Sequence, residues 1–168
     1  METVEQTPKY SLNEEEEKKL ILREYRSLQK VLKIKLKPGD KSLIRTAFEM
    51  AVDAHKTMRR KSGEPYILHP IAVAKICVEE IGLGIRSTIC ALLHDTVEDT
   101  DITLEDIERE FGNEIARIVD GLTKISNVID VNASQQAENF KKILLTLTDD
   151  PRVILIKLAD RLHRRLSP

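Results

Sequence analysis

Residues 94–101 concentrate one histidine and four carboxylates in eight positions: His94, Asp95, Glu98, Asp99 and Asp101. The stretch directly follows the apolar run Ala91-Leu92-Leu93, which we expect to be buried. Carboxylates beside a core are costly unless cations, hydrogen bonds or water compensate them. One divalent cation compensates several carboxylates at once. The composition therefore indicates a metal site.

A further candidate ligand, Asp160, lies on an apolar C-terminal run, where a carboxylate needs a partner. A salt bridge to a nearby Arg or Lys is the alternative to a metal. With His69, His94 and Asp95 it forms a set of two nitrogen and two oxygen ligands without a thiolate. This set suits Mn²⁺, Fe²⁺ or Mg²⁺ better than a structural zinc and leaves positions open for water and substrate. It predicts metal-assisted phosphoester hydrolysis.

Two neighbouring groups have side chains suited to the same chemistry. Glu98 and Asp99 follow the histidine–aspartate pair within about one helical turn, so they could hold a water or take its proton. The alternative for this pair is a solvated acidic helix end. The stretch from Arg59 to Gly63 combines guanidinium, ammonium and hydroxyl groups with a glycine, which is typical of phosphate binding. Its alternative is a solvated basic turn.

The composition predicts one compact all-α domain. The chain has 168 residues, of which 41% are hydrophobic, contains no Trp and has a formal net charge of −1. Leu, Ile, Ala, Glu and Lys dominate, and strand signals are nearly missing. Cys77 and Cys90 lie in apolar runs and are interpreted as small buried hydrophobes.

The same survey excludes several kinds of partner. The first residues resemble no signal peptide, and no apolar run is long enough to span a bilayer, so we expect a cytoplasmic protein without membrane contact. Basic helix faces with interleaved aromatic residues are missing, so we expect no direct nucleic-acid binding.

Helical periodicity and capping residues predict about eight helices that must position these groups. A helical extension is expected over residues 1–39 and the main domain over residues 40–168. The expected helices begin at a capping box over Ser11–Glu14, at Asp40 (fraying near Met58), at Pro70 (to Ile81), at Ile85 (to about Val97), at Thr103 (to Phe111), at Asn113, over Ala137–Leu147 and at Asp150. The run Val153–Ile156 is apolar on nearly every side and is expected to be central.

Three segments of the chain resemble one known family. They are residues 60–66 (RKSGEPY) followed by His69-Pro70, residues 94–100 (HDTVEDT) and residues 157–163 (KLADRLH). Together they resemble the N-terminal hydrolase domain of the long bifunctional RelA/SpoT alarmone enzymes. Residues 111–112 with Ile115, 120–124 and 137–140 are also similar to the long members rather than to the short stand-alone hydrolases.

The resemblance implies an HD-type helical bundle that removes the 3′-pyrophosphate from guanosine tetra- and pentaphosphate. The implied cofactor is one Mn²⁺ ion; Mg²⁺ and Fe²⁺ are less expected. It implies a guanine nucleotide as substrate and, in the intact protein, a synthetase domain and C-terminal regulatory domains. The implied metal ligands are His69, His94, Asp95 and Asp160. Glu98 and Asp99 would position and activate the attacking water. Substrate contacts would come from Arg60, Lys61, Ser62 and Tyr66.

The C-terminal segment departs from the family pattern. Arg164 stands where the family has an asparagine that contacts the nucleotide or holds water, and residues 164–168 replace the usual continuation. A cation at this position could meet a phosphate or pair with an acid. The domain is expected to be truncated at its C-terminus. Two alternatives therefore stay open: a regulatory module that binds nucleotide without turnover, and an HD phosphohydrolase that acts on another nucleotide.

Overall fold

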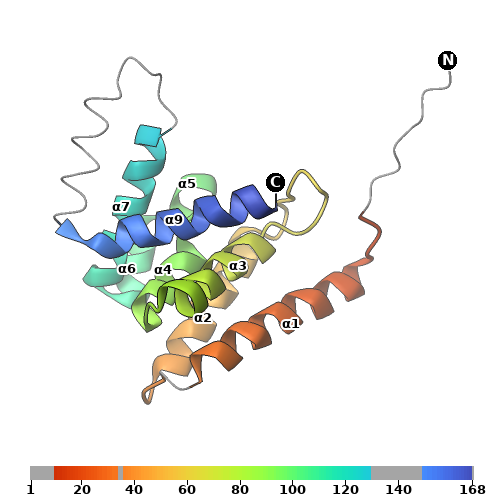
Figure 1. Cartoon of the computed structure of the whole chain (residues 1–168), viewed down its shortest axis with the longest axis horizontal. Helices are drawn as coiled ribbons and strands as arrows, with labels where there is room; N and C mark the ends of the chain where they lie inside the picture. The colour runs from red at the N-terminus through yellow and green to blue at the C-terminus, as the bar shows by residue number, and fades with distance from the viewer. Residues whose placement is uncertain (1–9, 34–35, 130–148, 168) are drawn as a thin grey trace.

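The computed structural model describes residues 10–33, 36–129 and 149–167; for residues 127–129 it describes the backbone alone. Within these ranges the chain is helical and contains no strand, which confirms the all-α prediction. A single isolated bridge pairs Arg59 with Pro65. The helices in chain order (Figure 1) are α1 (Glu14–Leu32), α2 (Asp40–Ala54), α3 (Leu68–Ile76), the π-helical η1 (Cys77–Ile81), α4 (Ile85–Leu93), α5 (Thr96–Asp99), α6 (Leu104–Phe111), α7 (Asn113–Ile129) and α9 (Pro151–Leu166).

Side-chain caps set several of these boundaries. The Thr103 hydroxyl and the Asp106 carboxylate form a reciprocal capping box at α6, as predicted. The predicted box at Ser11 is wrong, because Asn13 caps α1 by accepting a hydrogen bond from the Glu16 backbone N–H at 2.9 Å. Asp40 is the first residue of α2 rather than its cap. The N-cap is Gly39, whose φ of 87° suits a residue without a Cβ.

Two predicted helices run differently from expectation. The second helix ends at Ala54, before the expected fraying point at Met58. The third begins at Leu68, and its last turn changes to the π-helix η1 before Gly82 ends it with a φ of 80°. The sequence carries no simple signal for that change, because the apolar pattern is continuous across Ile76 and Cys77.

The helix α4 is the centre of the hydrophobic core. Every residue from Ser87 to Leu93 is buried, and α4 contacts α2, α3, α7 and α9. Cys77 and Cys90 are both buried and unpaired, as interpreted from the sequence. The helix α1 packs on the same core through Tyr25, Leu28 and Leu32, and the Tyr25 and Phe48 rings stack at a centroid distance of 3.9 Å. The boundary at residue 39 stays a prediction.

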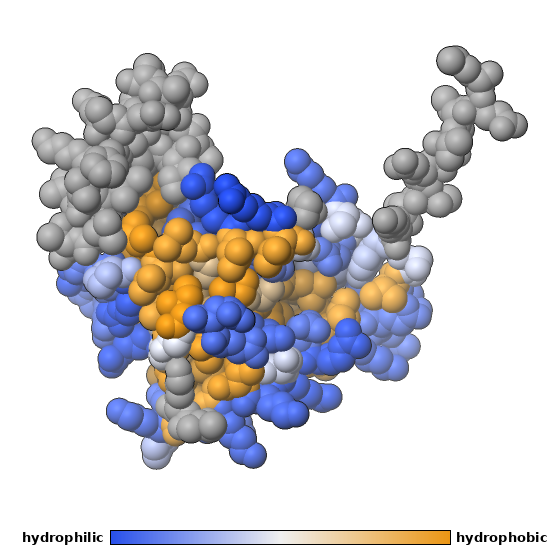
Figure 2. All heavy atoms as spheres, viewed as in Figure 1, coloured by the Kyte–Doolittle hydropathy of each residue, from blue (hydrophilic) through white to orange (hydrophobic). Residues whose placement is uncertain are grey.

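The last helix is less central than its composition suggested. In Figure 1 α9 lies across α3 and α4, and it contacts both of them as well as α7. Only one of its faces is buried, through Val153, Ile156, Ala159 and Asp160. The opposite side exposes Leu158, Leu162 and Leu166, and Figure 2 shows hydrophobic side chains gathered on the face where α9 lies. Within the run expected to be central, Val153 and Ile156 are buried and Ile154 and Leu155 are half-buried, so α9 borders the core through one face rather than lying at its centre.

The predicted fourth helix is interrupted where the candidate ligands occur. The α-helix ends at Leu93 and a separate turn, α5, begins at Thr96. His94 and Asp95 lie between the two and are 4% exposed each. The change of direction turns both side chains inward instead of placing them on a helix end that faces solvent.

The helix expected over residues 137–147 lies outside the described residues. Among the residues that are described, no helix is both long and apolar enough to cross a bilayer.

The core prediction can be tested with Leu92→Ala. Because Leu92 is 0% exposed, the variant is expected to lose about 2–5 kcal/mol of unfolding free energy, measured by urea denaturation. The matched control is Leu22→Ala on α1, whose side chain is 45% exposed and should cost less than about 0.5 kcal/mol. Equal losses in the two variants would contradict the assignment of α4 to the core.

An ion pair connects α1 to the basic stretch from Arg59 to Gly63, and it predicts that the stability of the fold depends on pH. Arg59 donates two hydrogen bonds to the Glu17 carboxylate, and Tyr10 donates a third. The hydrogen bonds from Arg59 are the main reason that the pKa of Glu17 lies below its usual range. Their stabilisation is present above the unfolded-state pKa of about 4.3 and is lost as the pH falls through the lower folded-state pKa.

Glu17→Gln is therefore expected to lower the thermal midpoint at pH 7, and the difference from wild type should shrink below about pH 4. Glu15→Gln, an exposed neighbour with the same change of charge, is the control and should have little effect. A deficit of the Glu17 variant that stays constant down to pH 3 would contradict this role.

Candidate metal centre and active site

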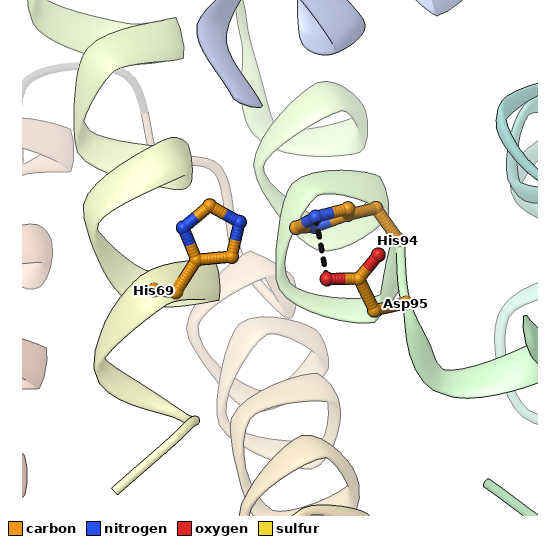
Figure 3. Close-up of side chains that lie close together, drawn as sticks. All are labelled: His69, His94 and Asp95. Atoms are coloured by element: carbon orange, nitrogen blue, oxygen red, sulfur yellow. Dashed lines mark ion pairs between the residues drawn. The ribbon is translucent and has the colours of Figure 1, made fainter. Parts of the chain in front are cut away.

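The four predicted metal ligands come together from three separate segments of the chain. His69 lies on α3, His94 and Asp95 lie in the break after α4, and Asp160 lies on α9. His69, His94 and Asp95 each offer a ligand atom within 4.8 Å of the others (Figure 3). The Oδ1 atom of Asp160 lies 2.7 Å from His69 Nε2 and 3.4 Å from His94 Nε2. Sequence positions 91 residues apart thus meet at one point.

Hydrogen bonds fix the orientation of both imidazoles. His94 Nδ1 lies 2.6 Å from the Ala91 carbonyl oxygen, so it must carry a proton and donate. This leaves His94 Nε2 fully buried without a hydrogen bond, although Asp95 Oδ2 is only 2.9 Å away. His69 is held between Asp160 and His163, whose Nδ1 lies 2.7 Å from His69 Nδ1. An oriented ring with an unsatisfied inward nitrogen is typical of a metal ligand.

Burial and charge act on these groups in opposite directions. Burial lowers the pKa of His69 to about 4, so this imidazole is neutral at pH 7. Burial alone would lower the pKa of His94 as well, but the charges of Asp95 and Asp160 raise it to about 10. Burial disfavours the charged forms of Asp95 and Asp160. His94 nevertheless keeps the pKa of both carboxyls below the usual range, together with Tyr66 at Asp95 and His69 at Asp160. Both aspartates are therefore charged at neutral pH.

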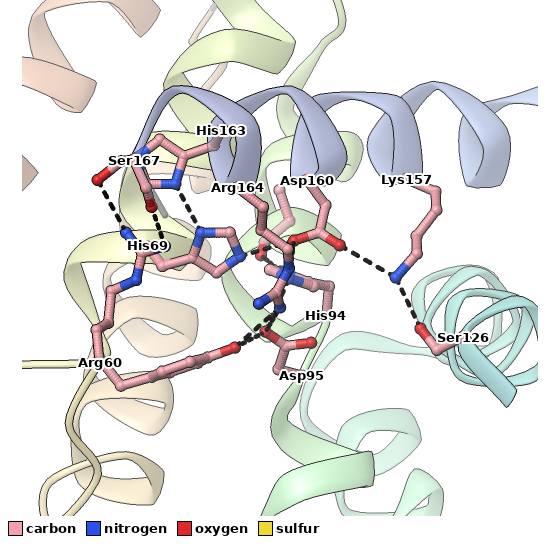
Figure 4. Close-up of polar contacts among 12 residues, drawn as sticks. Arg60, His69, His94, Asp95, Ser126, Lys157, Asp160, His163, Arg164 and Ser167 are labelled. Atoms are coloured by element: carbon pink, nitrogen blue, oxygen red, sulfur yellow. Dashed lines mark hydrogen bonds and ion pairs between the residues drawn. The ribbon is translucent and has the colours of Figure 1, made fainter. Parts of the chain in front are cut away.

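Two cations of α9 compensate the buried carboxylates, as Figure 4 shows. Lys157 Nζ lies 3.0 Å from Asp160 Oδ2 and 2.9 Å from Ser126 Oγ. Arg164 donates from Nε to Asp160 Oδ1 at 3.0 Å, and its terminal nitrogen lies 3.6 Å from Asp95 Oδ2. The salt bridge considered for Asp160 is thus present together with its histidine contacts.

The residues present fit a divalent metal. Two imidazoles and two carboxylates converge, and one buried imidazole nitrogen is left without a hydrogen bond. Basic side chains form ion pairs with the carboxylates. This mixture of nitrogen and oxygen ligands without a thiolate suits Mn²⁺, Fe²⁺ or Mg²⁺.

A cavity of about 480 Å³ lies beside the ligands. The candidate catalytic pair, Glu98 and Asp99, lines it, and both residues are exposed. Burial and the charge of Asp95 raise the pKa of Asp99 above the ordinary value. The complete lining comprises Tyr66, Asp95, Glu98, Asp99, Ser126, Lys157, Asp160, Arg161 and Arg164.

Two of the five predicted substrate contacts, Tyr66 and Arg164, line this cavity. The Tyr66 hydroxyl donates to Asp95 Oδ2 and accepts from Arg164, and burial together with Asp95 raises its pKa. Lys61 and Ser62 are exposed outside the cavity lining, and Ser62 donates to Glu64. Arg60 donates to the backbone oxygen of Ser167 at 2.6 Å and to its hydroxyl at 3.3 Å.

Sequence reasoning gave no site role to three residues that contact the candidate ligands directly or through one other side chain. His163 contacts His69, Lys157 contacts Asp160, and Ser126 contacts Lys157. Helical spacing could have found the first two, because they lie three residues after and before Asp160 on α9. Ser126 gave no signal, since only tertiary packing brings α7 alongside α9.

The HD-domain family matches residues 47–166 of the chain. This region is most of the chain and includes all four candidate ligands. The chain therefore belongs to the HD-domain family.

Curated relatives narrow this assignment to one group within the family. A guanosine-3′,5′-bis(diphosphate) 3′-pyrophosphohydrolase of Aquifex aeolicus (strain VF5) is 49% identical over 119 residues, which are 71% of this chain and 17% of that protein. The bifunctional (p)ppGpp synthase/hydrolase SpoT of Escherichia coli (strain K12) is 42% identical over 140 residues, 83% of this chain and 20% of that protein. The chain is thus an HD domain of the RelA/SpoT type, which confirms the resemblance. It spans about a fifth or less of the length of these relatives.

A solved structure agrees with this grouping. It is described as a metazoan ortholog of SpoT that hydrolyzes ppGpp and plays a role in starvation responses. The TM-score is 0.59 at 30% sequence identity, and the match covers 77% of this chain and 70% of that chain.

Metal binding gives a direct test of the centre. Mn²⁺ is expected to raise the thermal midpoint of the metal-free chain, because a ligand at 100 times its Kd stabilises the folded state by about 2.7 kcal/mol. Asp95→Asn should abolish the rise and EDTA should reverse it. Asp101→Asn, the same change at an exposed residue of the same stretch, should keep it. An Asp95 variant that responds to Mn²⁺ like wild type would refute the ligand assignment.

Proposed function

We propose that this chain is the hydrolase domain of a long RelA/SpoT-type enzyme. It removes the 3′-pyrophosphate from guanosine tetra- and pentaphosphate, giving GDP or GTP and pyrophosphate, as part of alarmone turnover in the stringent response. The observation that carries this proposal is the convergence of His69, His94, Asp95 and Asp160 beside a cavity lined by two further carboxylates. The functions for which the relatives and the solved structure are named support the choice of nucleotide.

The metal in this proposal is one Mn²⁺, with Mg²⁺ or Fe²⁺ as less favoured ions. His69, His94, Asp95 and Asp160 would hold it. When bound, such an ion lowers the pKa of water and offsets the negative charge of a phosphate group. The neutral state of His69 and the ionised state of both aspartates favour metal binding at neutral pH. His94 is charged in the metal-free protein and would release a proton when the metal binds.

Glu98 and Asp99 are the proposed catalytic pair. Both line the cavity next to Asp95, so a water held there lies within reach of a carboxylate. The raised pKa of Asp99 suits a group that accepts the proton of the attacking water and later passes one to the leaving 3′-oxygen. Tyr66 keeps its proton and holds Asp95 in place through its hydrogen bond.

The proposed substrate contacts are Arg60, Lys61, Ser62, Tyr66 and Arg164. Tyr66 and Arg164 line the cavity, whereas Lys61 and Ser62 are exposed beyond that lining on the loop that also carries Arg60. Arg60 would exchange its contacts with Ser167 for the nucleotide, and a planar guanidinium is suited to clamp a phosphate or stack on a base.

The intact protein is proposed to carry a synthetase domain and C-terminal regulatory domains, because the relatives are much longer than this chain. A cytoplasmic location belongs to the same proposal, since the named relatives include enzymes of bacterial nucleotide metabolism.

One observation favours a second candidate, a regulatory module that binds nucleotide without turnover. Arg60 and Arg164, both proposed to meet the substrate, are already bonded to groups of this chain. Calorimetry distinguishes the two functions, because the module should bind guanosine tetraphosphate and release no product. An HD phosphohydrolase with another substrate would instead hydrolyse a competing nucleotide faster than guanosine tetraphosphate.

Turnover tests the first function. The chain with Mn²⁺ and guanosine tetraphosphate is expected to release GDP and pyrophosphate, measured by ion-exchange chromatography. Glu98→Gln and Asp99→Asn should each lower kcat by about 10²–10⁴-fold, because each removes a proton-transfer or water-holding group. Both variants should retain the stabilisation by Mn²⁺, and Asp101→Asn is the control for the change of charge. Unaltered kcat in both variants would refute the assignment of the pair.

A further inference from the structure

The position of Arg164 on the metal-binding side of the site carries an inference beyond the function proposed above. Asp160 uses its two oxygens differently: Oδ2 contacts Lys157, while Oδ1 contacts His69, His94 and Arg164. In Asp95, Oδ2 lies 2.9 Å from His94 Nε2 and 3.6 Å from the guanidinium of Arg164, and it accepts a hydrogen bond from Tyr66. Arg164 therefore approaches, in each carboxylate, the oxygen that faces the histidine nitrogens.

Lys157 does not share this position. It contacts only the outward oxygen of Asp160, is held by Ser126 and has a side chain that is 16% exposed. Its charge can stay in place when a metal is bound to the inward oxygen atoms. Figure 4 shows the contrast, with Arg164 reaching between Asp160 and Asp95 and Lys157 turned toward Ser126.

A guanidinium and a divalent cation cannot both keep the same inward oxygens, because like charges repel strongly in a partly buried site. Arginine also stays charged at every pH of interest, so deprotonation cannot relieve the conflict. We propose that Arg164 is an internal counterion that substitutes for the metal in the metal-free protein and must leave the carboxylates when the metal binds. Arg164 thereby sets the metal affinity of this domain.

The location of Arg164 allows this movement. It lies in the last turn of α9, its side chain is 46% exposed, and it lines the open cavity. Its third contact is the Tyr66 hydroxyl at 3.2 Å, a neutral group that can remain a partner after the carboxylates are given up. The displaced guanidinium then lies at the cavity and is available to an anionic phosphate. Arg164 would thus pair with an acid without metal and meet a phosphate with metal bound, the two roles that its sequence position allowed.

The test is Mn²⁺ binding by the metal-free full chain, measured by titration calorimetry and, for free Mn²⁺, by electron paramagnetic resonance. Arg164→Asn is expected to lower the Kd about tenfold or more, because the metal no longer displaces a cation. Arg164→Lys keeps the charge but loses the planar fork and should fall between the two. Arg161→Asn, a cation of the same cavity without a contact to the ligands among those described, and Arg165→Asn, an exposed neighbour, should each change Kd less than threefold.

A second readout does not depend on affinity. Removing Arg164 leaves carboxylates less compensated, so Arg164→Asn should lower the thermal midpoint of the metal-free protein while increasing the rise that saturating Mn²⁺ produces. If Arg164→Asn fails to fold without metal, the Kd of Arg164→Lys decides the question.

The inference rests on the metal centre of the proposed function and not on the nucleotide. Mn²⁺ binding by the Arg164→Asn variant but not by wild type would support the role of Arg164 in its strongest form. Equal Kd values for wild type and Arg164→Asn, or weaker binding by the variant, would overturn the role of Arg164 and leave the metal centre intact. An absence of Mn²⁺ binding in both proteins would refute the metal centre and the role of Arg164 together.

Discussion

The structure around the site depends on the burial of two carboxylates, Asp95 and Asp160, against a helical core. Each is less than 5% exposed, so each must be matched by positive charge and hydrogen bonds. His69, His94, Lys157 and Arg164 supply these partners, and they come from α3, α9 and the break after α4. The carboxylates are therefore compensated only while these segments stay packed against one another.

The backbone supports this arrangement by a local exception to regular structure. The central helix α4 stops at Leu93, and its next residue, His94, turns its Nδ1 back to the Ala91 carbonyl. This bond uses a carbonyl oxygen near the helix end and fixes which imidazole nitrogen faces the site. A helix continued to Val97 would have spaced His94 and Asp95 by about 100° around its axis. The interruption instead lets consecutive residues serve one centre.

Much of the fold could be predicted from the sequence, because helix periodicity and caps such as Thr103 act locally. The candidate ligands His69, His94, Asp95 and Asp160 could be proposed from their chemistry together with the family resemblance, because a salt bridge was an equally physical partner for Asp160. Four features could not be predicted. The break at His94 and the π-helix η1 have no signal in the local apolar pattern. The exposed leucines of α9 look like core residues in such a pattern. The engagement of Arg60 by Ser167 depends on a contact across 107 positions of the chain. Local patterns carry no information about such distant partners.

The spread of the ligands along the chain has a consequence for the mechanics of the domain. His69 and Asp160 are 91 positions apart, so an ion held by both closes most of the domain into one loop, much as a disulfide does, but reversibly. The element fastened in this way is α9, which carries Asp160, Lys157, His163 and Arg164 and packs on the rest through one face only. If the proposed metal centre forms, metal availability would govern how firmly the C-terminal helix stays docked. The ion would then stabilise the tertiary structure as well as serve the chemistry of the cavity.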